Sequence, residues 1–282
     1  MTAATLTSAR HRTTSSDREP AVTRPPEGDD TVILRCVRGG RTVLWGAPWH
    51  LGSAAYWVAQ VLPSPPDDED RRRHALGTTL EEEVAACLLG GHGVPAAVGL
   101  AAYGALRETG MLYPGEAPTA QQVEAVLRAP VVVHGRPTRY RFASQRAARI
   151  ADSLAVLAKH PAPKEPLALR AWLLNLPGIG PKTASWVVRN RCGSDQVAIV
   201  DIHVLRAGVI AGIFDPSWTA ARHYDLLEEL FLAWARQGSV SAADLDAVVW
   251  AGMARLGHAA ARTLGHTPGQ ASRYFVPSDN FG

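Results

Sequence analysis

The stretch that decides the fold lies in the second half of the chain and reads Leu176-Pro177-Gly178-Ile179-Gly180-Pro181-Lys182-Thr183-Ala184. Gly178 and Gly180 permit backbone conformations and close approaches that other residues resist. Pro181 is favourable at the first position of a helix, because a backbone N–H has no helical partner there. Apolar residues at helical spacing precede and follow the turn. The stretch therefore predicts two helices joined by a tight hairpin.

The predicted hairpin is also suited to bind an anion. Backbone N–H groups of the turn and of the helix that begins at Pro181 form a concave set of donors, which fits one phosphate. A plain turn between two helices, with glycines for tightness alone, is the alternative. Two glycines, two prolines and basic surroundings favour DNA binding, so Gly178, Gly180 and Pro181 are predicted to contact DNA.

Positive charge is concentrated around this hairpin. The chain of 282 residues has a formal net charge of only +3, but between Arg136 and Arg191 eleven Lys and Arg residues face two acidic residues. This window carries +9, and the remaining chain carries −6. Such a density is expected of a protein that binds the phosphate backbone, and a solvated basic surface is the alternative. Arg189, within the window, is predicted to contact DNA.

Lys182 and Asp201 are the candidates for chemistry. Lys182 lies in the first turn of its predicted helix, where the helix dipole disfavours a cation, so it is a candidate Schiff-base nucleophile. A lysine that only contacts a phosphate is the alternative. Asp201 follows four apolar residues and is predicted to be the N-cap of the next helix. An N-cap carboxylate can also stabilise a developing positive charge, so the two roles are compatible.

The rest of the chain is predicted to be mostly helical. A β-hairpin is expected from residues 31–36 and 41–45, with its turn at Gly39-Gly40. Thr79 and Glu82 form a predicted capping box at the beginning of the first long helix. Helical spacing predicts helices at residues 79–89, 95–107, 119–128, 143–159, 166–175, 181–190, 201–212, 219–237 and 241–256.

Composition excludes several classes of protein. The chain is 46% hydrophobic and 20% charged, as is typical of a globular protein, and no apolar run approaches the roughly 20 residues of a membrane span. Cys36, Cys87 and Cys192 lie too far apart for a disulfide framework, a zinc site or a four-cysteine iron–sulfur cluster. Residues 1–29 lack an apolar segment and are expected to form a disordered tail, not a signal peptide.

The run from Leu176 to Ala184, followed nineteen residues after Lys182 by Asp201 in Val-Asp-Ile-His-Val, resembles the helix–hairpin–helix (HhH-GPD) DNA glycosylase superfamily. A lysine at the position of Lys182 resembles the bifunctional members that also cleave abasic sites, and most of all 8-oxoguanine DNA glycosylase. The lack of a C-terminal cysteine cluster argues against the endonuclease III branch. The specific match covers about residues 170–206, and a looser helical match extends over about 80–215.

The resemblance implies a mostly α, two-lobed fold with a small β-containing N-terminal region. Residues 30–83 and 199–282 would together form one lobe, and residues 84–198 would form a helical domain that ends in the helix–hairpin–helix. The base pocket would lie between them. The protein is then expected to act as a monomer on nucleoid DNA in the cytoplasm, and not at a membrane.

The resemblance also implies the reaction. The enzyme would flip a modified base, first of all 8-oxoguanine, out of duplex DNA. Lys182 would attack C1′ as the base leaves, Asp201 would stabilise positive charge on the sugar, and the Schiff base would then release the 3′ phosphate. This chemistry requires no metal ion or other cofactor. A glycosylase for another modified base, including a phage-type base removed in defence, and a non-enzymatic DNA-binding module are the alternatives.

Three residues are predicted to line the base pocket. Trp186 stands where oxoguanine glycosylases often carry a cysteine that helps sandwich the base, and Trp250 occupies a region that in the family lines the opposite wall. Both can stack on a flipped base, and aromatic core residues are the alternative. Asp246 is a candidate for reading the edge of the base, and a solvated surface acid is its alternative.

Two histidines complete the predicted site. His92, within Gly90-Gly91-His92-Gly93, is the candidate to fill the gap that the extruded nucleotide leaves, and a plain helix break is the alternative. His203, two residues after Asp201, resembles a family position near the active site. It is predicted to contact a DNA phosphate, and a packed structural histidine is the alternative.

Overall fold

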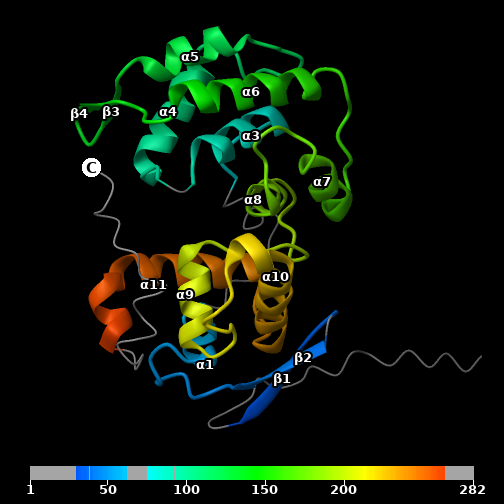
Figure 1. The fold of residues 1–282 in the computed structure, drawn as a ribbon, viewed down its shortest axis with the longest axis vertical. Coiled ribbons are helices and arrows are strands. Elements are labelled where there is room, and N and C mark those ends of the chain that lie inside the picture. Colours follow the sequence, from blue (N-terminus) through cyan, green and yellow to red (C-terminus); the bar gives the residue numbers. More distant parts are fainter. Residues whose placement is uncertain (1–29, 38, 62–74, 92, 264–282) are drawn as a thin grey trace, which may run out of the picture.

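The computed structural model describes residues 30–37, 39–61, 75–91 and 93–263. Most of its regular structure is helical, with two separate two-stranded sheets (Figure 1). The predicted mostly α fold is therefore confirmed. The predicted tail, residues 1–29, and the candidate His92 lie outside the described residues. No helix of the described ranges is long and apolar enough to cross a membrane.

The middle of the chain packs around one hydrophobic core, in the upper part of Figure 1. Each helix turns an apolar stripe inward, so that Leu106, Ile150 and Leu173 are fully buried, and each such side chain stabilises the fold by about 1.5–3 kcal/mol. The elements of this part are α3 (Leu80–Leu89), α4 (Ala96–Glu108), α5 (Ala120–Arg128), β3 (Val131–Val133), β4 (Arg136–Thr138), α6 (Ala143–Leu157), α7 (Pro166–Leu173) and α8 (Pro181–Cys192).

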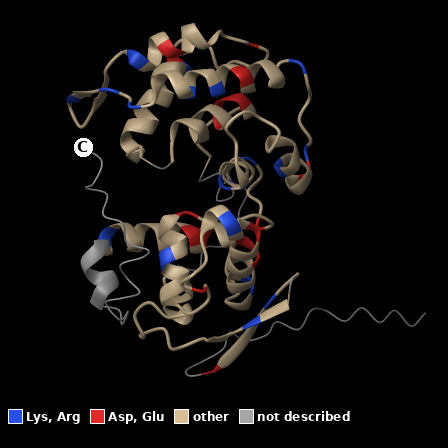
Figure 2. Ribbon diagram, viewed as in Figure 1, with Lys and Arg blue, Asp and Glu red and all other residues tan. Residues whose placement is uncertain are grey.

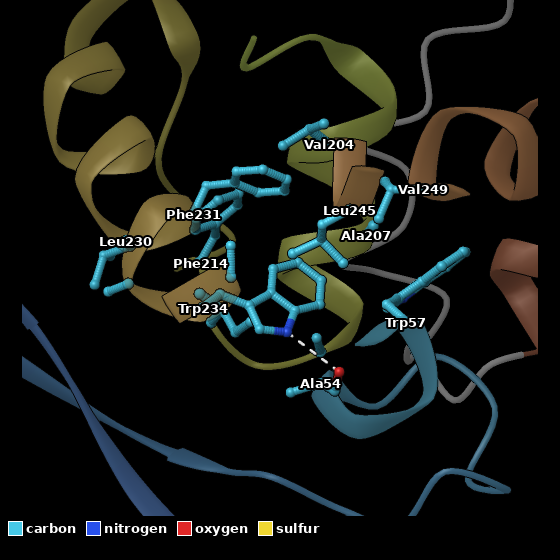
Figure 3. Close-up of a cluster of buried hydrophobic side chains, with 14 of the residues drawn as sticks. Ala54, Trp57, Val204, Ala207, Phe214, Leu230, Phe231, Trp234, Leu245 and Val249 are labelled. Atoms are coloured by element: carbon cyan, nitrogen blue, oxygen red, sulfur yellow. Dashed lines mark hydrogen bonds between the residues drawn. The ribbon is translucent and has the colours of Figure 1, made fainter. Parts of the chain in front are cut away.

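The two ends of the described chain share a second core, in the lower part of Figure 1. Trp234 at its centre is fully buried, and its indole N–H donates a hydrogen bond to the carbonyl of Ala54 at 3.2 Å (Figure 3). This contact joins residues 180 positions apart in the sequence. The elements are β1 (Thr31–Cys36), β2 (Gly39–Leu44), α1 (Ala54–Ala59), α9 (Ile202–Ile210), α10 (Ala220–Gln237) and α11 (Ala242–Thr263).

The chain crosses from the first core to the second in a short buried segment. Val197 packs in the core of α3–α8, whereas Ala198 and Val200 pack in the second core. All four residues from Val197 to Val200 are less than a tenth exposed. The next residue, Asp201, therefore lies at the boundary between the two cores, where α9 begins.

Several predicted elements differ in detail. The predicted turn at Gly39-Gly40 is wrong, because both glycines pair with β1 and belong to β2. The six-residue α1 and the hairpin of β3 and β4 were not predicted, since elements of three to six residues are too short for a period to be read. Helix α11 continues beyond the predicted end at residue 256 to Thr263.

The predicted capping box at the beginning of α3 forms only in part. The side chain of Thr79 accepts a hydrogen bond from the backbone N–H of Glu82, as expected. The carboxylate of Glu82, however, accepts from the backbone N–H and hydroxyl of Thr78 instead of from Thr79. These hydrogen bonds lower the pKa of Glu82 against the opposing effect of its burial, which is the larger single contribution.

Candidate active site at the helix–hairpin–helix

The predicted helix–hairpin–helix is formed by α7, α8 and residues 174–180 between them. Gly178 has a φ of +78°, and a Cβ at this position would lie 2.2 Å from Cδ of Arg149, so the turn requires glycine on both grounds. Leu176 and Ile179 anchor the turn in the core of α3–α8. Gly180, the N-cap of α8, faces open space, since a Cβ at this position would have no neighbouring atom within 4 Å. The turn is thus anchored on one side and open on the other.

Lys182, the second residue of α8, is half-buried beside an aromatic ring. Its Nζ lies 5.7 Å from the ring centroid of Trp186, one helical turn further on, within the range of a cation–π contact. The tip of the indole approaches the loop after α3, where a Cβ on Gly90 would lie 2.9 Å from Cη2 of Trp186. Gly90 therefore leaves the space that this side chain occupies.

Asp201 is the N-cap of α9, as predicted. Its Oδ1 accepts hydrogen bonds from the backbone N–H groups of His203 at 2.8 Å and Val204 at 2.9 Å. Both bonds use the same oxygen, which leaves Oδ2 outside the cap. A carboxylate held in this way has a fixed orientation and retains one oxygen that can face a substrate.

His203 lies in the electrostatic field of both candidate catalytic residues. Burial lowers its pKa, the Asp201 carboxylate opposes this effect, and the positive charges of Arg206 and Lys182 add to it. Its Nδ1 is buried without a hydrogen-bond partner. The ring packs against Trp250, with centroids 5.9 Å apart at an angle of 71°. The indole of Trp250 is on the surface, since the residue is 46% exposed, and not in the core.

Asp246, on α11, is buried near the same two residues. Burial raises its pKa to about 7, an effect that Arg189 and Lys182 oppose and that the negative charge of Asp201 increases. The charges of Lys182 and Asp201, which come from different elements, therefore both act on Asp246 and on His203. Electrostatic interactions thus link these four side chains at the boundary between the two cores.

Arg189 is the partner of Asp246. Its Nη1 lies 3.2 Å from Oδ2 of the carboxylate, and both side chains are 11% exposed. Arg189 thus lies in the interior in an ion pair, whereas the basic window of the sequence predicts that it contacts DNA. Asp246 is likewise not the surface acid of the alternative interpretation.

A polar cluster behind the site was not predicted from the sequence. Glu228 on α10 is 7% exposed and accepts hydrogen bonds from Ser185 on α8, from Arg170 on α7 and from the backbone N–H of Ala198. A signal was present, because Glu228 interrupts an otherwise apolar stripe of its helix, where Leu227, Leu230 and Phe231 are buried. Its partners are far away in the sequence, so the pattern alone does not identify them.

Basic side chains are spread over the upper part of the molecule. Figure 2 shows Lys and Arg on the hairpin of β3 and β4 and on α6. Arg136, Arg139 and Arg141, at and beyond β4, are exposed. Arg149 on α6 lies against Gly178 of the helix–hairpin–helix turn, which places a cation beside that turn.

Comparisons with known proteins find a family model and several solved structures that match this chain. A model of the 8-oxoguanine DNA glycosylase family (Ogg-HhH) matches residues 71–240. The solved structure of the 8-oxoguanine DNA glycosylase of Thermotoga maritima is 26% identical, and the match covers 70% of this chain and 88% of that one, with a TM-score of 0.49.

Two structures from Methanocaldococcus jannaschii also match. Its 8-oxoguanine DNA glycosylase is 23% identical over 64% of this chain and 84% of that one, with a TM-score of 0.50. Its 8-oxoguanine glycosylase/lyase, in complex with 15mer DNA containing 8-oxoguanine, is 20% identical over 71% and 96%, with a TM-score of 0.53. At this identity the two structures show the fold. Because the family match spans more than half of the sequence, the chain belongs to the 8-oxoguanine DNA glycosylase family of helix–hairpin–helix DNA glycosylases.

Proposed function

We propose that this protein excises a modified base, first of all 8-oxoguanine, from duplex DNA and then cleaves the abasic site as a lyase. The observation that carries the proposal is the position of Lys182 at the beginning of α8 and of Asp201 at the beginning of α9, where the charges of both act on Asp246 and His203. A nucleophile and a carboxylate that stabilises charge are the two groups that this reaction needs. The proposal includes a monomeric enzyme acting on nucleoid DNA.

The reaction begins with the neutral amine of Lys182 and with a base extruded from the duplex. The lone pair of Nζ forms a bond to C1′ while the C1′–N glycosidic bond breaks, and the base leaves with its electron pair. The secondary ammonium group formed at Nζ then releases a proton, and the base takes one up. Asp201 stabilises the positive charge that develops on the sugar during this step. The N,O-acetal at C1′ then opens: the C1′–O4′ bond breaks, O4′ takes up a proton from solvent, and the lone pair of Nζ forms the protonated Schiff base between Lys182 and C1′. Loss of a C2′ proton expels the 3′ phosphate and breaks the strand.

Trp186, Trp250 and Asp246 are the proposed contacts of the flipped base. The half-buried ring of Trp186 and the 46%-exposed ring of Trp250 offer stacking faces on α8 and α11. The carboxyl of Asp246, with a pKa of about 7, can accept hydrogen bonds when ionised and can also donate one when protonated. His203, Gly178, Gly180 and Pro181 are the proposed contacts of the DNA backbone.

Borohydride trapping tests the reaction. Wild-type protein incubated with duplex DNA containing 8-oxoguanine opposite cytosine should form a covalent adduct when sodium borohydride reduces the Schiff base. Lys182→Gln should abolish the adduct and retain binding of the same duplex. Wild-type protein that forms no adduct with any modified duplex, or with an abasic duplex, would show that the lyase proposal is wrong.

The modified base is tested with a set of duplexes that differ only at one base. Each duplex carries 8-oxoguanine, an alkylated base, a deaminated base or a bulky phage-type base, and excision is measured in single turnovers. The proposal expects 8-oxoguanine to be excised fastest. A faster reaction with another base reassigns the substrate, and binding without excision of any base favours the non-enzymatic DNA-binding module.

A further inference from the structure

Helix α10 contacts both elements that carry the candidate catalytic residues. Oε1 of Glu228 accepts hydrogen bonds from the hydroxyl of Ser185 at 2.7 Å and from the backbone N–H of Ala198 at 2.9 Å. Ser185 lies three residues after Lys182, on the next turn of α8, and Ala198 lies three residues before Asp201. One carboxylate oxygen therefore joins the helix of the lysine to the segment that leads to the aspartate.

The second oxygen of Glu228 completes a closed cluster. Oε2 accepts from Nη2 of Arg170 at 2.7 Å, and Nε of Arg170 donates to the hydroxyl of Ser185 at 2.9 Å. Arg170 belongs to α7, so both helices of the helix–hairpin–helix are joined to the same carboxylate. Burial raises the pKa of Glu228, whereas its hydrogen bonds from Ser185 and Ala198 and the charge of Arg170 oppose this effect.

Tyr224, one helical turn before Glu228 on α10, also contacts the segment that leads to Asp201. Its hydroxyl donates to the carbonyl of Ala198 at 2.9 Å and accepts from the backbone N–H of Val200 at 3.2 Å. The peptide groups of the crossing segment, which belong to no sheet, thus find their partners in two side chains of α10. A buried backbone group without such a partner is costly, so these two side chains determine the path of the segment.

We propose that Glu228, assisted by Tyr224, is a positioning residue that holds Lys182 and Asp201 in reacting register. It does not contact the substrate; it acts through Ser185 on α8 and through Ala198 on the segment before Asp201. This role rests on the proposed function of the two catalytic residues. It goes beyond them because it assigns the distance between nucleophile and carboxylate to a third element, which belongs to the second core.

Steady-state excision over a range of duplex DNA concentrations tests the proposal with Glu228→Gln. In this variant an NH2 group, which is a donor, replaces one carboxylate oxygen, which is an acceptor. Because Ser185, Arg170 and Ala198 all donate to this side chain, at least one of the three hydrogen bonds is lost. Because a displacement of about 1 Å in reacting groups can lower a rate by about 100-fold, we expect kcat to fall about 10- to 100-fold with KM near that of wild type. Tyr224→Phe, which removes only the hydroxyl, should lower kcat in the same direction by less.

Glu83→Gln is the matched control. Glu83 on α3 is fully buried and also accepts from two backbone N–H groups, those of Leu76 and Gly77. It accepts as well from two side chains, the amide of Asn190 at the far end of α8 and the thiol of Cys87 on its own helix. It contacts neither Ser185 nor the crossing segment. This variant should lower the melting temperature as Glu228→Gln does and leave kcat of the folded protein close to that of wild type.

A double variant separates positioning from stability. Arg170→Met with Glu228→Leu replaces the buried ion pair by apolar side chains, which should restore the melting temperature relative to Glu228→Leu alone. Because Ala198 and Ser185 still lack their acceptor, kcat should stay low. Recovery of kcat together with the melting temperature would overturn the proposal, and so would a normal kcat in Glu228→Gln. Wild-type protein is measured first: if it excises no base, the proposed function fails, whereas a failure confined to the variants concerns Glu228 alone.

Discussion

At the scale of single residues, Asp246 is an acidic side chain that is almost excluded from water. Its side chain is 11% exposed, as is that of its ion-pair partner Arg189, and Asp201 adds a second negative charge nearby. Burial outweighs the attraction of Arg189 and Lys182, so the pKa rises to about 7. Near neutral pH this residue is therefore partly protonated and can change its hydrogen-bonding pattern toward a bound base.

Asp246→Asn should change how stability depends on pH. In wild type the folded carboxyl keeps its proton up to about pH 7, whereas the unfolded chain loses it near the ordinary value of 3.8. The folded state thus binds more protons in this range, and the group lowers stability as pH rises, by up to about 1.4 kcal/mol per pH unit. Thermal melts between pH 4 and 8 should show wild type losing stability relative to the variant until about pH 7. A difference that is constant with pH contradicts the assigned shift.

Gly90→Ala should displace the indole of Trp186. Gly90 has an ordinary φ of −87°, so the added methyl group causes no backbone strain and acts only through its 2.9 Å approach to Cη2. If Trp186 stacks on the flipped base, excision should slow by about tenfold and tryptophan fluorescence should shift. Gly104→Ala on α4 is the control, since no atom lies within 4 Å of its Cβ position. It should keep full activity and gain about 1 kcal/mol of stability from helix propensity.

At the scale of elements, some residues of the helix–hairpin–helix turn anchor it in the core, and others lie on its open side. Leu176 and Ile179 bury its inner side, and Gly178 lets Arg149 lie across it. Gly180 and Pro181 begin α8 on the open side, where the first N–H groups of a helix have no internal partner. The two glycines therefore have different roles, which the sequence alone does not distinguish.

Replacing Gly178 and Gly180 by alanine, one at a time, distinguishes these roles. Gly178→Ala should lower both the melting temperature and the affinity for duplex DNA, because a positive φ costs a non-glycine residue about 1–2 kcal/mol and the methyl group collides with Arg149. Gly180→Ala, with a φ of −97° and free space, should lower the melting temperature less than Gly178→Ala does, because only the preference for glycine at the N-cap is lost. Its affinity, measured by fluorescence anisotropy, should still fall, because the methyl group obstructs a phosphate. Wild-type affinity of Gly180→Ala would mean that DNA does not approach this backbone.

At the scale of the whole molecule, the basic window and the acidic residues of the site belong to different cores. The window with a charge of +9, residues 136–191, lies within the upper part of the molecule, around the first core. The lower part contributes Asp201, Asp246 and Glu228 through α9, α10 and α11. The surface arginines proposed to contact the duplex and the acidic groups proposed for chemistry and positioning thus come from different cores.

Salt dependence tests the basic surface. Each phosphate that the protein neutralises contributes about 0.9 to the slope of log K against log salt concentration, so a slope of about −3 or steeper is expected. Replacing Arg136, Arg139 and Arg141 together by Ser should make the slope shallower. Arg35→Ser, an exposed position on β1 at the opposite end of the molecule, is the control and should leave it unchanged. An unchanged slope in the triple variant would exclude these arginines from the DNA contact.

Much of the fold and the core of the candidate site could be predicted because they depend on local chemistry. The turn at Gly178 and Gly180, the beginning of α8 at Pro181 and the cap at Asp201 follow from the backbone preferences of single residues, which act over three or four positions. Long helices follow from a period repeated over several turns. The short hairpin of β3 and β4 repeats no period and was missed for that reason.

The sequence by itself determined the helix–hairpin–helix, the candidate lysine and aspartate, and the concentration of positive charge. Only the tertiary structure decided that Arg189 is buried against Asp246 and that Glu228 joins α7, α8 and the segment before Asp201. The physical reason is the separation along the chain over which each interaction acts. Caps and turns act between neighbours along the chain, whereas burial and ion pairing depend on which distant elements meet, as Ser185 and Glu228 do across 43 positions.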